Sequence, residues 1–166
     1  MPRPTVEVWF EFASTYSYLT VARVEARLAE HGLDLAWRPF LLGPVFRQQG
    51  LETSPFVLNP TKGAYMWRDM ARRAARLGLP FRRPSVFPMN GLNAARLMTA
   101  ALDQPWCGAF ARSVFAAQFA DGADIADEAV LRDALAACGA DPAHWWAEAR
   151  RAETKAALRA RTDEAM

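Results

Sequence analysis

The sequence is poor in the residues that bind metals or form disulfides. Its 166 residues include two cysteines and two histidines. Cys107 and Cys138 lie far apart in alanine-rich stretches, and no C-x-x-C motif occurs. A structural zinc site needs four ligands at short spacings, so we expect no metal site. Isolated cysteines of this kind are typical of a reduced, cytoplasmic protein.

Long apolar runs and clustered positive charge are missing as well. No segment approaches the ~18–20 apolar residues of a membrane span, and the first residues lack the apolar core of a signal peptide. The net charge is +2, and the basic residues, nearly all arginines, are scattered among alanines and acids. A nucleic-acid interface needs a clustered basic face with stacking aromatics. We therefore expect neither a membrane span nor a nucleic-acid partner.

Apolar and aromatic residues, by contrast, are abundant. They make up 52% and 11% of the chain, enough to bury a core in one ordinary domain. Residues 5–12 have the β-branched and aromatic composition of a strand. Residues 16–31 show the apolar and charged faces of a helix that ends at Gly32, and residues 33–40 predict a second strand. This order predicts a parallel βαβ unit.

From residue 42 onward, glycines and prolines replace the strand pattern. They predict a long irregular stretch of functional-loop length. Beyond it, the spacing of apolar residues predicts helices that end at glycine, proline or aspartate turns. These helices span about residues 62–77, 90–103, 105–120, 127–138 and 142–162. The predicted fold class is therefore α/β, with a small βαβ start and a large all-helical segment.

The end of the chain does not close this fold. A two-stranded parallel sheet is too small to be stable alone. Residues 159–166 still have a helical composition where the sequence stops. Either the helices supply all of the remaining core or further strands follow Met166, and we expect the latter.

Hydroxyl side chains follow the first predicted strand, in the run Ser14-Thr15-Tyr16-Ser17. The unpaired N–H groups at a helix start stabilise an anion, and a neighbouring hydroxyl can donate a further hydrogen bond to it. Serine and threonine are also common helix N-caps without any ligand. From these residues alone, capping is the simpler interpretation of Ser14.

The surroundings of Ser14 add a family resemblance. The segment 10–19, Phe-Glu-Phe-Ala-Ser-Thr-Tyr-Ser-Tyr-Leu, resembles the opening of the 2-hydroxychromene-2-carboxylate isomerases and kappa-class glutathione transferases. Blocks at residues 42–46, 60–70 and 78–90 agree with that family in order and spacing. The resemblance covers essentially the whole chain. It implies a DsbA-like thioredoxin fold with a helical insertion, in which a serine replaces the first redox cysteine.

The resemblance also implies how the chain is organised. Residues 1–41 would begin the thioredoxin-like domain, residues 42–150 would form the helical insertion, and residues 151–166 would return toward the first part. The family continues into a Gly-x-Phe-Gly-x-Pro block with a cis-proline and a Trp-Gly-x-Asp block, its C-terminal strands included. These blocks are absent from the 166 residues, so we expect an incomplete version of a longer chain. The family is typically homodimeric.

The resemblance implies glutathione as cofactor. Ser14 matches the serine that contacts glutathione and would hold its sulfur as the thiolate, which adds reversibly to an aromatic or conjugated carboxylate. The implied reaction interconverts 2-hydroxychromene-2-carboxylate and trans-o-hydroxybenzylidenepyruvate, or a related electrophile. Lys62 and Asn90 match two further family positions and would also bind the cofactor. The alternatives are a solvated lysine and a simple helix cap.

The sequence leaves two other functions open and excludes a third. A kappa-like glutathione transferase would use the same thiolate chemistry, and no residue separates it from an isomerase. A DsbA-like dithiol oxidoreductase needs cysteines at positions 14 and 17, which are both serine, so redox exchange is excluded there. A non-catalytic helical interaction module would suit a chain without the glutathione-closing blocks.

Glu52 departs from the family pattern. Many relatives have asparagine at this position, and an ionised carboxylate cannot donate the hydrogen bond that an amide can donate to a ligand.

Overall fold

Two parallel strands form the start of the chain. The computed structural model describes residues 3–166. Strand β1 (Thr5–Phe10) pairs in parallel with β2 (Asp34–Pro39), and the buried Val8 lies opposite the buried Trp37. These two strands are the only sheet within the described residues. The predicted parallel βαβ unit is confirmed.

The connection between the strands differs from the prediction. A single helix over residues 16–31 is wrong, because the chain forms α1 (Thr15–Val21) and α2 (Val24–Glu30) with a break at Arg23. The break allows the two helices to contact different elements: α1 packs on a later helix, α7 (Cys107–Ala116), whereas α2 packs on β2. The predicted left-handed end of this segment is confirmed at Gly32, which has a φ of 65°.

The stretch after β2 is more helical than predicted. Residues 42 onward contain α3 (Leu42–Gln48) and α4 (Pro55–Leu58) instead of an irregular loop. The prolines were misleading because both Pro44 and Pro55 lie in the first turn of a helix, where a missing N–H costs nothing. The long helix α5 (Pro60–Arg76) follows, as the apolar spacing predicts.

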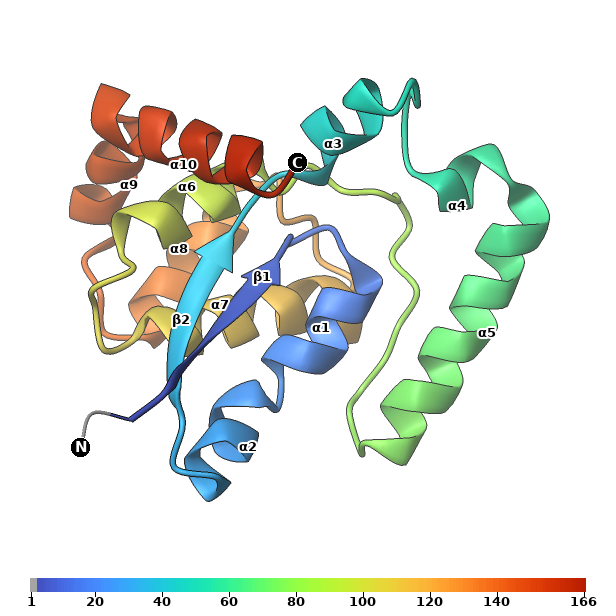
Figure 1. Ribbon diagram of the computed structural model, residues 1–166, viewed down its shortest axis with the longest axis horizontal. Helices are drawn as coiled ribbons and strands as arrows, with labels where there is room; N and C mark the ends of the chain where they lie inside the picture. The colour runs from blue at the N-terminus through green and yellow to red at the C-terminus, as the bar shows by residue number, and fades with distance from the viewer. Residues whose placement is uncertain (1–2) are drawn as a thin grey trace.

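Five further helices and a π-helical turn complete the chain. A long connection returns from α5, which stands at one edge of the molecule, past α1 to α6 (Leu92–Ala100) (Figure 1). Among residues 3–166, no helix is of sufficient length and apolarity to cross a membrane. The remaining elements are α6 (Leu92–Ala100), α7 (Cys107–Ala116), the π-helical turn η1 (Ala117–Asp121), α8 (Glu128–Ala137), α9 (Pro142–Arg150) and α10 (Ala152–Glu164).

The helix predicted over residues 142–162 is also divided. At Arg151 the backbone is extended, with a ψ of 150°, and the Thr154 hydroxyl donates to the Glu148 carbonyl at 2.8 Å. The division lets both α9 and α10 pack on α6. From there α10 reaches β2 and α3, where the Leu41 N–H donates to the Thr162 hydroxyl at 3.2 Å.

Aromatic side chains join the sheet to the helices. Phe12 is fully buried and stacks on Phe115 of α7, with ring centroids 5.2 Å apart. Phe10 at the end of β1 packs edge-on against Phe12 at 5.3 Å and tilted against Phe115 at 6.1 Å. The aromatic end of β1 therefore packs against Phe115 of α7.

A buried glycine sets how closely α4 and α5 approach. A Cβ added at Gly63 would collide with the carbonyl oxygen of Phe56. We expect Gly63→Ala to lower the free energy of unfolding by about 1–3 kcal/mol through overpacking, despite alanine's higher helix propensity. Denaturant titration measures this. Gly43→Ala is the matched control, because its Cβ would meet only the Arg47 guanidinium at 3.7 Å. Equal stability of both variants would contradict the prediction.

Candidate functional site

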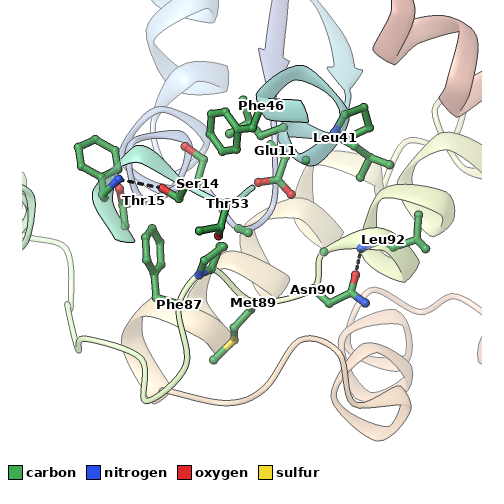
Figure 2. Close-up of a pocket in the computed structure, with 18 of the residues that line it drawn as sticks. Glu11, Ser14, Thr15, Leu41, Phe46, Thr53, Phe87, Met89, Asn90 and Leu92 are labelled. Carbon is green, nitrogen blue, oxygen red and sulfur yellow. Dashed lines mark hydrogen bonds between the residues drawn. The ribbon is translucent and has the colours of Figure 1, made fainter. Parts of the chain in front are cut away.

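An open pocket of about 470 Å³ lies at the carboxyl end of β1. Four segments separated in sequence line it: residues 11–16 from the end of β1 into α1, 41–47 around α3, 52–56 at the start of α4, and 87–92 at the start of α6. Figure 2 shows side chains from these segments turned toward a common space. A volume of this size is typical of small-molecule sites.

Ser14 occupies the start of α1 on the wall of this pocket. Its N–H donates to the Glu11 carbonyl at 3.0 Å, and its Oγ accepts the N–H of Ser17 at 3.3 Å. The capping interpretation of Ser14 is therefore confirmed. Capping uses the oxygen only as an acceptor, so the hydroxyl hydrogen is still available to a ligand in the pocket. Ligand contact by Ser14 stays a prediction.

The other hydroxyl groups of this segment are engaged elsewhere. The Thr15 hydroxyl is buried and points to the sulfur of Met66 at 3.5 Å. The Tyr16 hydroxyl donates to Asp69 of α5 at 2.9 Å, although its ring lines the pocket. Ser17 Oγ accepts the N–H of Glu11 at 3.4 Å. Within residues 14–17, Ser14 is thus the hydroxyl best placed to meet a ligand.

Asn90 and Lys62, the two other predicted cofactor contacts, have different positions. Asn90 lines the pocket, and its Oδ1 accepts the N–H of Leu92 at 3.0 Å, which leaves its amide NH₂ group as a donor (Figure 2). Lys62 does not line the pocket. Its ammonium lies 5.6 Å from the ring centroid of Phe56, which does. The structure therefore brings Ser14 and Asn90 into one pocket lining and places the Lys62 ammonium over the ring of Phe56, outside that lining.

Arg47 is a pocket residue that sequence reasoning missed. It lines the pocket from α3, with its guanidinium close to Gly43. The helical spacing of the apolar residues around it is the signal that could have found it, had the region not been assigned to an irregular loop. Glu52 lies exposed in the same lining, so the pocket carries one basic and one acidic side chain at its accessible side.

Glu11 is the second residue that sequence reasoning missed. Its side chain lines the pocket, yet the residue is only 7% exposed. Burial raises the pKa of Glu11 to about 7, although a hydrogen bond with the Ala13 backbone partly opposes this. Gly91 provides room for the carboxyl group, because a Cβ there would lie 2.9 Å from Glu11 Oε1. Glu11 can therefore change charge near neutral pH.

Metal-binding side chains do not gather in the part of the chain that the structure describes. Across residues 3–166, no three His, Cys, Asp or Glu side chains are grouped so that they could hold a metal ion. The chemistry available in the pocket is that of a hydroxyl, a carboxyl group, amides and a guanidinium.

The βαβ unit, the helical insertion and a pocket at the turn after the first strand define a thioredoxin-like fold. Serines stand at positions 14 and 17 of that turn and helix. Residues 5–166 match the DSBA-like thioredoxin domain, and the chain belongs to this family. The predicted family and fold class are confirmed.

Solved structures with the same fold carry different functional names. A 2-hydroxychromene-2-carboxylate isomerase matches with a TM-score of 0.84 and 21% identity, covering 97% of this chain and 78% of that chain. A probable DsbA oxidoreductase from Streptomyces coelicolor matches with a TM-score of 0.73 and 20% identity, covering 97% and 74%. Likeness at such identity shows the fold alone. No curated protein matches the sequence.

The buried carboxyl group predicts a pH-dependent stability. The pKa of Glu11 is about 7 in the folded chain, against an ordinary value of 4.5. The folded state binds this proton more tightly, so the stabilisation is full below about pH 4.5 and is lost as pH rises through about 7. Glutamine cannot ionise, so Glu11→Gln should not lose stability as pH rises through about 7. Relative to wild type, its free energy of unfolding should rise by about 2–3 kcal/mol between about pH 5 and about pH 8.

Denaturant titrations at a series of pH values measure this difference. Glu52→Gln is the matched control, because it removes the same charge from an exposed position of the same pocket. It should keep the wild-type pH dependence. Parallel stability curves for Glu11→Gln and wild type would show that the carboxyl is already solvated in the folded chain.

Proposed function

We propose that the pocket binds glutathione and uses its thiolate to isomerise a conjugated carboxylate of the 2-hydroxychromene-2-carboxylate type. The observation that carries the proposal is the Ser14 hydroxyl, which keeps its hydrogen for a ligand on the wall of a pocket of about 470 Å³. The fold shared with a 2-hydroxychromene-2-carboxylate isomerase supports the same activity. The family resemblance of residues 10–19 supports it independently.

The chemistry requires a stabilised thiolate. A free thiol is mostly protonated at neutral pH, and the thiolate is the nucleophile. Ser14 donates its hydroxyl hydrogen to the sulfur and so lowers the cost of the negative charge. The thiolate adds to the double bond conjugated with the carbonyl, the resulting single bond rotates, and elimination returns glutathione. The protein contributes binding, orientation and charge stabilisation.

The lining suits both partners of this reaction. Glutathione carries carboxylates, for which a guanidinium is a strong partner, and Arg47 provides one. The Asn90 amide provides a donor for a peptide carbonyl. Leu41, Phe46 and Phe87 offer apolar walls on which an aromatic acid can pack. A cytoplasmic location, where thiols stay reduced, suits this chemistry.

Two alternatives use the same pocket differently. A glutathione transferase would conjugate an electrophile and release the adduct, and its products distinguish it from an isomerase. A dithiol oxidoreductase is disfavoured by the serines at positions 14 and 17. The cysteines of the chain do not replace them, because Cys107 and Cys138 lie outside the pocket lining and burial raises the pKa of both thiols.

Ser14→Ala tests the role of the hydroxyl. We expect glutathione-dependent isomerisation to slow by an amount equivalent to about 2–4 kcal/mol, as for the loss of one oxyanion-type donor, and this is measured as kcat. The variant also loses its N-cap, worth about 1 kcal/mol of stability. Asp127→Ala is the control, because Asp127 caps α8 through the Ala129 N–H at 2.9 Å, outside the pocket lining. If both variants had equal turnover, Ser14 would act only as the N-cap of α1.

Arg47→Ala tests how the cofactor is held. Loss of a charge-assisted hydrogen bond to a carboxylate should raise the KM for glutathione by roughly 10- to 100-fold. Arg47→Lys should recover part of the affinity, since it keeps the charge but not the planar fork. Lys62→Ala should raise KM less, because Lys62 does not line the pocket. A larger effect at Lys62 than at Arg47 would reverse this assignment.

A further inference from the structure

The carboxyl group of Glu11 is the buried ionisable group that the proposed thiolate chemistry leaves without a role. Glu11 and Ser14 are the first and fourth residues of one tight turn, closed by the 3.0 Å bond from the Ser14 N–H to the Glu11 carbonyl. The Cα atoms at the ends of such a turn lie within about 7 Å of each other. In Figure 2 the Glu11 carboxyl group lies among the lining side chains, between Ser14 and Asn90 in that view.

The other ionisable groups of the lining are less suited to exchange a proton with a ligand. The Tyr16 hydroxyl donates to Asp69, and the Arg47 guanidinium has hydrogen-bond donors but no acceptor for a proton. Glu52 is an exposed carboxylate on the loop before α4. Among residues 3–166, no charged side chain contributes to the ionisation of Glu11, which burial alone disfavours.

We infer that Glu11 is the proton acceptor of the site, taking the proton of a glutathione thiol that binds beside Ser14 and returning it when glutathione leaves. This inference rests on the proposed function, because it assigns a second residue to the same thiolate. A carboxylate in a poorly hydrated position is a strong base relative to one in water. It therefore accepts a proton that an exposed carboxylate would leave on the sulfur.

The step is balanced without any further reactant. The S–H bond breaks as an O–H bond forms on Glu11, and Ser14 stabilises the remaining sulfur lone pair. The thiolate forms a C–S bond with the substrate, and the displaced electron pair moves to the conjugated carbonyl oxygen. After rotation, the pair returns, the C–S bond breaks, and the sulfur recovers the proton from Glu11 on release. Neutralising Glu11 first also removes a like charge from beside the thiolate.

The experiment counts the protons released when glutathione binds. Calorimetric titration at about pH 7.5, in buffers of different ionisation enthalpy, measures this number while most free thiol is still protonated. Wild type should release close to no protons, because Glu11 keeps the thiol proton. Glu11→Gln should release close to one proton per site and should bind glutathione at least tenfold more weakly. Glu52→Gln, which removes the same charge from an exposed position of the pocket, should release as few protons as wild type.

A second variant and a pH–rate profile test the same role of Glu11. Glu11→Asp keeps a carboxyl group and should release no more than about half a proton per site. This variant serves as the test if Glu11→Gln fails to fold. The rate of isomerisation in wild type should fall as Glu11 becomes protonated below about pH 7, and Glu11→Gln should lack this limb. Equal proton release by Glu11→Gln and wild type would overturn the role of Glu11 and leave glutathione binding intact. No glutathione binding by wild type would overturn the proposed function itself, and the inference with it.

Discussion

The turn between β1 and α1 fixes the polar groups of the pocket relative to the sheet. Glu11 and Ser14 stand at its two ends, and Phe12 between them is fully buried against Phe115. Because the Phe12 ring is held in the aromatic core, the turn cannot rotate without breaking that packing, which is worth several kcal/mol for a buried phenylalanine. The rigidity of the site is thus a property of the core below it.

A glycine completes this arrangement from the other part of the chain. Gly91 lies directly over the turn, and a Cβ there would be 2.9 Å from Glu11 Oε1 and 3.1 Å from Phe12 Cβ. This close approach seals the carboxyl group from water on one side and places Asn90 in the pocket wall. The helical insertion therefore does more than cover the sheet, since it creates the low-polarity surroundings that set the acidity of Glu11.

The features that were predicted correctly are those set by residues close together in the sequence. The first strand, the capping by Ser14 and the confirmed βαβ order all follow from residue types within a few positions of each other. The breaks at Arg23 and Arg151 carry no glycine or proline, and tertiary packing determines them. The first lets α1 and α2 contact different elements, and the second lets both α9 and α10 pack on α6. The burial of Glu11 depends on segments distant in sequence, which no local pattern reveals. Arg47 was missed for a different reason, because its local helix α3 was assigned to an irregular loop.

The pocket draws its walls from four segments spread over the first 92 residues, and none of them encloses any space alone. Contacts of such long sequence separation are established late, after the loops between them have been closed at an entropic cost. A partly folded molecule, even one with its strands and first helices formed, therefore has no cavity to offer. A ligand can therefore bind in the pocket only after these four segments have come together.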